Sequence, residues 1–263
     1  MAVVETERHG QVLVVRMNRP DRLNALNTEM RAELARIWAD FRHDRALEVA
    51  VFTGTGRGFC AGEDMKESLE RGQPGGQRPA IEDPFMAGTL EKPVIAAVNG
   101  FAMGGGFMLV ERTDLRLAVK GAVFEVSEAK RWLLGGYNHG HIANLPFPIA
   151  MEMALGFRFT AERFYELGFL NRLCEPEQLM PEALRMAEHL LTLPPASRVN
   201  TVHMMRQMRP APAANQQRLA ALLHEHGAKS DLMESRAAFA EKRKPNFKGW
   251  NDPEDRYRLP ALE

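Results

Sequence analysis

The sequence predicts an α/β fold followed by a mainly helical C-terminal part. Short β-favouring runs alternate with segments of helical period up to about Pro146, and beyond it apolar residues recur mainly at helical spacing. No motif recurs with a period of about 20–50 residues, so the pattern does not indicate a repeat array. With 263 residues, of which 45% are hydrophobic and 26% charged, the chain is long enough to build a large core.

The first elements are a hairpin and a helix. Residues 3–7 and 12–17 are β-favouring runs separated by His9-Gly10, which predicts two strands joined by a turn. From residue 28 to residue 43 the apolar side chains fall on one helical face, and Asn27 or Thr28 can act as the N-cap.

The middle of the chain carries further strands and two loops. Residues 48–53, 92–98 and 115–119 each predict a strand. The segment 67–83 is rich in proline, glycine and charge, which predicts a surface loop. The triplet Gly104-Gly105-Gly106 lies between a strand and a helical segment, so the alternation favours parallel βαβ units.

The C-terminal part contains three helical signals. Residues 160–167 form a periodic segment that ends at Gly168, and Pro181 opens a second helix that runs to Leu193. Apolar periodicity continues from residue 215 to residue 243.

Composition excludes several classes of function. Thirty-four basic and thirty-four acidic residues give a formal net charge of zero, which does not favour nucleic acid or anionic membranes as partners. Cys60 and Cys174 match neither a disulfide framework nor a metal-ligand spacing, so we expect no metal. No leader and no run of about eighteen apolar residues is evident, and we therefore expect a cytoplasmic protein without a membrane span.

Two glycine-rich loops are the strongest candidates for a site. Residues 58–66 and 104–106 each follow a strand, and small residues there let a backbone N–H approach a ligand. Two such donors on one oxygen form an oxyanion hole, worth ~2.7–4 kcal/mol per donor in the transition state. Either loop alone is more often only a turn, and neither the GxxxxGK[ST] nor the GxGxxG phosphate pattern is present.

The order of the motifs resembles one known family. FCAGEDMKE, about forty residues before KPVIAAVNGFAMGGGF, together with NRPDRLNALN, FEVSEAK and AFAEKRKPNFKGW, resembles the enoyl-CoA hydratase/isomerase family, or crotonase superfamily, over about residues 12–250. FAEKR and AMEMAL are most similar to its carnitinyl-CoA dehydratase branch. The resemblance implies a spiral of ββα units with the acyl-CoA site in residues 1–195. It also implies a helical region at 196–263 that assembles the chain into homotrimers or homohexamers.

The resemblance also implies site residues. The peptide N–H groups of Glu63 and Gly105 would form the oxyanion hole, and the acyl-CoA would enter as substrate, so no separate cofactor is expected. Phe239 and Lys242 would reach the CoA of a neighbouring subunit, although core packing for Phe239 and a solvated helix face for Lys242 are open alternatives. The residues expected to contact substrate are Arg22, Leu23, Ala61, Gly62, Asp64, Met65, Lys66, Met108, Phe239 and Lys242.

The expected acid–base residues depart from the family pattern. Hydratases of the family carry two glutamates, and here Met108 occupies the first position while Glu128 aligns with the second. Methionine transfers no proton, so Glu128 is predicted to act as the single general acid and base. Glu111 follows Met108 by three residues and is a possible auxiliary, with a surface charge paired to Arg112 or Arg116 as the alternative.

Three further residues follow Glu128. Gly136 stands where the family uses a backbone amide to hold water, and His139 or His141 could supply an imidazole, although histidines in a loop are more often surface residues. The leading hypothesis is a hydratase/isomerase acting on an enoyl-CoA. The open alternatives are a double-bond isomerase, a thioester or C–C hydrolase using His139 or His141, and an acyl-CoA-binding protein without turnover.

Overall fold

The computed structural model describes residues 2–73, 79–131, 134–231, 233–247 and 261–262. The chain forms two compact units, each built from three stretches of sequence. We call Met1–Glu63, Gly76–Glu125 and Arg158–Arg209 the α/β unit, and Asp64–Gly75, Val126–Phe157 and Pro210–Glu263 the helical unit. The boundary predicted at residue 195 separates the core that carries the acyl-CoA site from the region expected to mediate assembly. It describes function and not compactness, and it stays a prediction.

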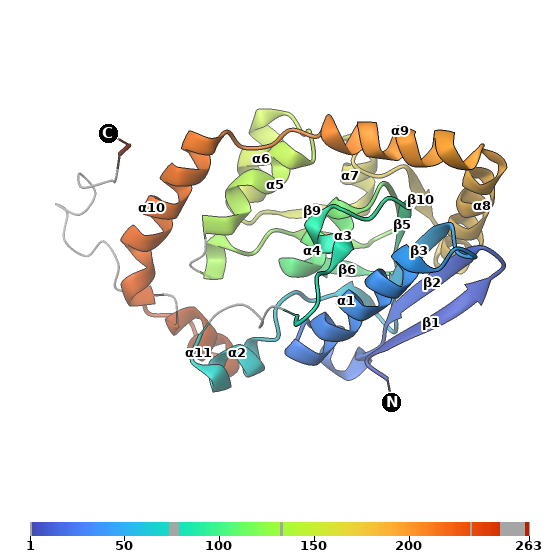
Figure 1. Ribbon diagram of the computed structural model, residues 1–263. Helices are drawn as coiled ribbons and strands as arrows, with labels where there is room; N and C mark the ends of the chain where they lie inside the picture. The colour runs from blue at the N-terminus through green and yellow to red at the C-terminus, as the bar shows by residue number, and fades with distance from the viewer. Residues whose placement is uncertain (1, 74–78, 132–133, 232, 248–260, 263) are drawn as a thin grey trace. The chain divides into compact units, whose positions relative to one another are not determined.

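The α/β unit contains two sheets (Figure 1). The six-stranded sheet has the order β1 (Val4–His9), β2 (Val12–Met17), β3 (Val49–Gly54), β5 (Val94–Val98), β7 (Leu115–Val119) and β10 (Arg172–Cys174). The four-stranded sheet has the order β4 (Gly58–Cys60), β6 (Phe101–Met103), β8 (Val123–Glu125) and β9 (Arg158–Thr160). The pairs β1–β2 and β8–β9 are antiparallel and the remaining pairs are parallel, so the predicted α/β class is confirmed.

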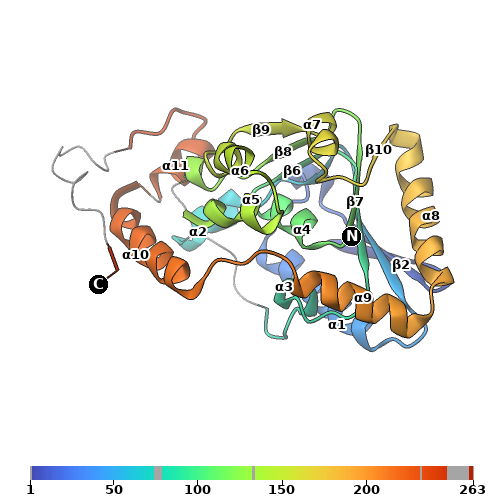
Figure 2. The same cartoon turned by 90° about the horizontal axis from the view of Figure 1, so that it is seen from above.

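Helices accompany the sheets of the α/β unit, and α8 lies against β3, β5 and β7 (Figures 1 and 2). These helices are α1 (Thr28–His43), α3 (Pro84–Ala87), α4 (Gly105–Arg112), α7 (Ala161–Glu166), α8 (Leu179–Thr192) and α9 (Pro195–Gln207), with short 3-10 turns at Pro20–Arg22 and Pro176–Gln178.

The helical unit has no strand among its described residues. Helices α5 and α6 lie side by side in both views (Figures 1 and 2), and α11 packs on α2. Its elements are α2 (Met65–Arg71), α5 (His139–Ile142), α6 (Phe147–Ala154), α10 (Ala214–Asp231) and α11 (Glu234–Ala240), with 3-10 turns at Ala129–Arg131 and Leu134–Asn138. Within the described ranges, no helix is long and apolar enough to cross a bilayer.

Several sequence predictions are confirmed and one is wrong. The hairpin pairs His9 with Val12, and the predicted helix 28–43 is α1, whose N-terminus is capped by the Asn27 side chain accepting from the Met30 amide at 2.9 Å. The surface loop predicted at 67–83 is wrong in its first part, because α2 continues to Arg71. Residues 74–78 of that segment lie outside the described residues.

Aromatic packing fixes the elements that carry the site. Phe107, the third residue of α4, is fully buried and stacks on Phe169 with ring centroids 5.4 Å apart. It also meets Phe124 of β8 edge to face at 6.4 Å. Aromatic pairs of this kind contribute ~0.5–1.5 kcal/mol each beyond burial of their area, so α4 is held firmly against the four-stranded sheet.

Candidate active site

The first glycine-rich loop lies against the segment that follows β2. Leu26 donates its amide to the Gly62 carbonyl at 2.7 Å, and Ala61 donates its amide to the Leu23 carbonyl at 3.0 Å. Gly62 has a φ of +88°, and a Cβ there would lie 2.6 Å from the Met103 carbonyl oxygen and 3.2 Å from the Gly105 nitrogen. Only glycine permits this approach, which brings the first loop directly against the second.

The second loop turns from β6 into α4. Gly104 has a φ of +50° and donates its amide to the Glu125 carbonyl at 2.8 Å. A Cβ on Gly106 would lie 2.4 Å from the Cys60 carbonyl oxygen, so the start of α4 sits tightly on the first loop. The first amides of a helix have no partner within it and carry the positive end of its dipole. The peptide groups of Glu63 and Gly105 therefore occur on adjoining loops of the α/β unit.

Asn24 supports the first loop, and sequence reasoning did not identify it. It is fully buried with a φ of +55°, and its Nδ2 donates to the carbonyls of Thr55 and Gly58 at 2.9 Å each. Cys60 Sγ in turn donates to the Asn24 carbonyl at 3.1 Å. The one available signal was the residue type, because asparagine tolerates a left-handed backbone better than most residues.

Cys60 is a structural thiol of this loop. Its side chain is fully buried, and burial raises the pKa of the thiol to about 12. The Gly62 amide donates to Sγ at 3.4 Å. A thiol with so high a pKa is a poor nucleophile at neutral pH, so its contribution is to packing and loop geometry.

A cavity of about 750 Å³ lies in the α/β unit, and its wall includes residues next to the second loop. Met108, in the first turn of α4, contributes to its wall, and so does Leu26, whose Cδ1 would lie 3.2 Å from a Cβ on Gly105. The cavity therefore reaches the residues that surround the Gly105 amide. The lining residues are mostly apolar: Leu26, Arg31, Leu34, Pro79, Ala80, Ile81, Glu82, Asp83, Met86, Ala87, Met108 and Leu109.

The carboxylate of Asp83, in the cavity wall, is hydrogen-bonded to backbone amides of the same chain. It accepts from the amides of Phe85 and Met86 at 3.0 Å each and so caps α3. Burial raises the pKa of Asp83 above its ordinary value.

Glu111 does not behave as a surface charge. Only 3% of it is exposed, so the alternative of a surface ion pair is wrong. It lies one turn after Met108 on α4, and its backbone carbonyl accepts from Arg116 Nη2 at 2.8 Å. Glu125 is buried too, but its carboxylate is paired with Arg158 Nε at 2.8 Å, which gives that carboxylate a structural role.

Within the helical unit, Glu128 and Gly136 lie together. A Cβ on Gly136 would be 3.4 Å from the Glu128 Cβ and 2.8 Å from Val126 Cγ1. The Glu128 side chain is half-buried and its Oε2 atom is shielded from solvent. The proposed acid–base residue and the glycine expected to hold water are thus neighbours.

His139 and His141 belong to a helix rather than a loop. His139 is 7% exposed, so the expectation of a surface residue is wrong for it, whereas His141 is exposed as expected. His141 lines a cavity of about 310 Å³ within the helical unit, together with Tyr137 and residues of α10.

The residues expected to contact CoA fall in both units. Arg22 is exposed at the end of its 3-10 turn, and Leu23 follows with a φ of +55°. In the helical unit, Asp64 caps α2 by accepting from the Glu67 amide at 3.3 Å. Met65 and Lys66 form the first turn of α2, and the exposed Lys66 is 4.0 Å from Glu70.

Helix α11 is joined to α2 of the same chain by buried polar residues. Arg236 Nε donates to Ser68 Oγ at 3.0 Å, and both residues are buried. Phe239 is 53% exposed, so core packing is the wrong interpretation for it. Lys242 is also exposed, just beyond the end of α11. In the described part of the chain, no group of three or more His, Cys, Asp or Glu residues could hold a metal.

Comparison with known proteins gives one consistent result. Residues 7–251 match the family described as enoyl-CoA hydratase/isomerase. The chain is 33% identical to enoyl-CoA hydratase EchA19 of Mycobacterium tuberculosis, over 94% of this chain and 99% of the relative. It is also 33% identical to carnitinyl-CoA dehydratase of Escherichia coli K12, over 92% and 97%. The crystal structure of a carnitinyl-CoA hydratase from Mycobacterium avium superposes with a TM-score of 0.81 at 30% identity, covering 94% of this chain and 99% of the other.

Proposed function

Because this chain belongs to the enoyl-CoA hydratase/isomerase family and is an acyl-CoA enzyme of the crotonase fold, we propose that it hydrates an enoyl-CoA thioester or dehydrates the corresponding 3-hydroxyacyl-CoA. The enolate of the thioester carbonyl is held by the peptide N–H groups of Glu63 and Gly105. The observation that carries the proposal is the close approach of Gly62 to Gly105, which a side chain on Gly62 would prevent.

The amide pair acts on the thioester oxygen. As a nucleophile adds to the β-carbon, negative charge moves through the conjugated system to this oxygen, where two N–H donors stabilise it. The Gly105 amide adds the positive end of the α4 dipole. Because these donors are fixed by tightly packed backbone, they need little reorganisation when the charge develops.

In the proposed mechanism Glu128 handles the proton on both sides of the enolate. As a carboxylate it takes a proton from a water molecule while that water attacks the β-carbon. The carboxylic acid then returns a proton to the α-carbon of the enolate, so Glu128 ends in the state in which it began. The backbone at Gly136 lies beside Glu128 and would orient the water. We propose that CoA enters only as part of the substrate, since this sequence of steps has no redox change.

The cavity beside Met108 supports a mainly apolar acyl group larger than crotonyl. Its volume of about 750 Å³ falls within the ~300–1,000 Å³ typical of small-molecule sites. Met108 supplies apolar wall where a second glutamate would supply a proton. Because one carboxylate is enough to move a double bond by proton transfer, Met108 also favours isomerisation as the second candidate activity.

The resemblance further supports a homotrimer or homohexamer as the assembly. Along α6 and its C-cap, Phe147, Met151 and Leu155 recur every fourth residue and are 74%, 45% and 58% exposed. An apolar stripe of this kind suits burial against another subunit. Light scattering during size-exclusion chromatography measures the assembly mass directly.

The proposed activity is tested on a panel of 2-enoyl-CoA thioesters from four carbons upward, with and without branches. We expect hydration, measured by loss of enoyl absorbance and by mass, to be most efficient above four carbons. Glu128→Gln should lower kcat by about 10²–10⁴-fold. Tight binding across the panel without turnover would instead identify an acyl-CoA-binding protein, and double-bond migration without hydration would identify an isomerase.

A further inference from the structure

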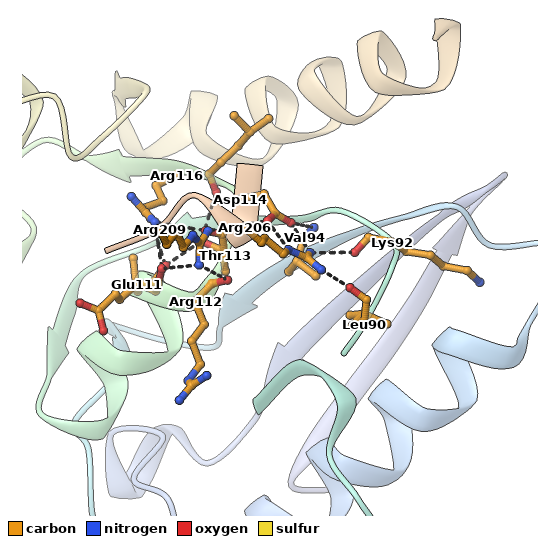
Figure 3. A network of polar contacts seen from close by, with 12 residues as sticks. Leu90, Lys92, Val94, Glu111, Arg112, Thr113, Asp114, Arg116, Arg206 and Arg209 are labelled. Atoms are coloured by element: carbon orange, nitrogen blue, oxygen red, sulfur yellow. Dashed lines mark hydrogen bonds and ion pairs between the residues drawn. The ribbon is translucent and has the colours of Figure 1, made fainter. Parts of the chain in front are cut away.

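The C-terminal end of α4 is bound by arginine side chains from elsewhere in the α/β unit (Figure 3). This helix has eight residues, so its ends are only about 12 Å apart. Its first residue is Gly105, and at its other end the Val110 carbonyl accepts from the capping Thr113 amide at 3.1 Å, while the carbonyls that follow lie beyond the reach of the helix's own amides. Whatever holds those carbonyls therefore helps to fix the position and direction of the amide at the other end.

Arg116, in β7, contacts three carbonyls at this end. Its Nε donates to the Val110 carbonyl at 3.2 Å, and its Nη2 donates to the carbonyls of Glu111 at 2.8 Å and Thr113 at 3.2 Å. Its guanidinium also lies over the Phe169 ring, 4.5 Å from the centroid, and Phe169 stacks on Phe107 of α4. Arg116 is therefore fixed by packing as well as by hydrogen bonds.

Arg209, just beyond the end of α9, approaches the same end of α4 and shares the Thr113 carbonyl with Arg116. Its Nη1 donates to the Arg112 carbonyl at 3.2 Å and its Nη2 donates to the Thr113 carbonyl at 2.8 Å. In Figure 3 the side chains of Arg116 and Arg209 converge on this end of α4, while the Glu111 carboxylate points away from them. Glu111 thus contributes a backbone oxygen to the contact.

Arg206, one turn before Arg209, anchors the same part of α9 without contacting α4. Its Nε and Nη2 donate to the two carboxylate oxygens of Asp114 at 2.8 and 2.7 Å, and Nη2 also donates to the Lys92 carbonyl at 3.2 Å. Asp114 accepts from the Val94 amide at 2.8 Å, which ties this pair to β5. Arg206 therefore ties the end of α9 to the six-stranded sheet, whereas Arg209 makes its own contacts with the end of α4.

The guanidinium groups of Arg116 and Arg209 lie close enough to repel each other. Burial, followed by the charge of Arg209, lowers the pKa of Arg116 to about 10. Burial also lowers the pKa of Arg209. Both groups remain charged at neutral pH, where a cation at a helix C-terminus complements the helix dipole and favours an anion at the N-terminus.

We infer that Arg116 and Arg209 are positioning residues for the oxyanion hole, because they clamp the C-terminal carbonyls of α4 and thereby hold the Gly105 amide at its N-terminus in place. This inference rests on the proposed function. The two arginines bind the end of α4 opposite the Gly105 amide, and they affect the thioester carbonyl through the position of that helix.

The test compares Arg209→Met with Arg206→Met. Both substitutions weaken the attachment of α9, but only the first removes donors from the α4 carbonyls. For Arg209→Met we expect kcat to fall by about 5–30-fold with KM changed less than about twofold, in line with the size of helix-terminus charge effects. Arg206→Met should lower the melting temperature while leaving kcat close to that of the parent, and Arg209→Lys should recover part of the lost kcat.

A spectroscopic readout separates positioning from stability. In a Glu128→Gln background, which keeps an enoyl-CoA intact, the infrared stretch of the bound thioester carbonyl should move to lower frequency than in water. Arg209→Met should reduce that shift and Arg206→Met should retain it. Equal shifts in all three proteins, or equal losses of kcat in the two methionine variants, would overturn the inference while leaving the proposed function standing. A parent protein that shows no shift would refute the oxyanion hole itself, and the inference with it.

Discussion

The α/β unit and the helical unit each hold candidate groups, and these groups are of different chemical kinds. In the α/β unit the candidate groups are backbone amides, and glycines at 62, 104 and 106 bring them together. In the helical unit the candidate group is a side chain, Glu128, with Gly136 beside it. The function of the backbone amides depends on how closely two backbone segments approach each other. The function of the side chain depends on which residue occupies position 128.

This difference explains how the chain tolerates Met108. A backbone donor is present whatever side chain occupies the next turn, so replacing a glutamate on α4 leaves the Gly105 amide in place. A side-chain function is lost when that one residue is replaced, and in the proposed mechanism Glu128 alone transfers the proton. We therefore expect substitutions that remove an amide or displace Glu128 to affect catalysis most.

Among changes to the backbone, the largest effect is expected from removing the Gly105 amide. Proline at the first position of a helix is compatible with helical geometry, so Gly105→Pro deletes one N–H while α4 can still form. We predict that kcat falls by about 10²–10³-fold, the cost of losing one oxyanion donor. Steady-state kinetics on the best enoyl-CoA measures this loss.

Gly105→Ala is the matched control for that variant. It keeps the amide and adds a methyl group that would lie 3.2 Å from Leu26 Cδ1, a contact that the flexible leucine can relieve. We expect the alanine variant to lose far less kcat than the proline variant. Equal losses in the two would show that the space around Gly105, and not its N–H, is what the reaction needs.

A smaller effect is expected in the helical unit from Gly136→Ala. The new methyl group would lie 2.8 Å from Val126 Cγ1 and 3.4 Å from the Glu128 Cβ, so it should displace the carboxylate. A misplacement of about 1 Å can lower kcat by up to about 10²-fold. Adding Val126→Ala should restore part of the activity by relieving the tighter contact. If Gly136→Ala alone does not lower kcat, Gly136 has no part in positioning Glu128 or water for the reaction.

The smallest effect concerns stability at alkaline pH. The pKa of Cys60 is raised by burial from 9.0 to about 12, so the folded state favours the neutral thiol. This contribution is fully present below pH 9 and is lost as pH rises toward 12. Relative to Cys60→Ala, the free energy of unfolding of the parent should fall by about 1.4 kcal/mol per pH unit in that window. Urea unfolding of both proteins from pH 8 to pH 11 measures this. A difference in free energy of unfolding that stays constant over this range would refute the prediction.

Long or strongly patterned elements could be predicted from the sequence. The β1–β2 hairpin and α1 have clear period and turn or cap signals, and both occur as expected. The four strands of the smaller sheet were all missed, because each has only three residues and carries no readable alternation. Helix α2 was missed because proline and glycine after Arg71 obscured a short helix that depends on the Asp64 cap.

The same limits apply to the site. The two glycine-rich loops were identified from sequence, since a backbone that must pass closely requires glycine at Gly62 and Gly106. Burial of Glu111 and His139 could not be predicted, because it depends on which segments distant in sequence cover them. Asn24 escaped notice for a similar reason, as its hydrogen bonds reach carbonyls more than thirty residues away.

The central claim is that one carboxylate, Glu128, moves the proton while the backbone holds the enolate. The most direct test is to follow solvent deuterium into the α-position of a saturated or 3-hydroxyacyl-CoA by mass spectrometry, for the parent enzyme and for Glu128→Gln. The account predicts α-exchange in the parent and its loss, together with hydration, in Glu128→Gln, with acyl-CoA binding unchanged. Exchange that persists in Glu128→Gln would contradict the account and assign the proton transfer to another base, with Glu111 and His139 as the buried candidates.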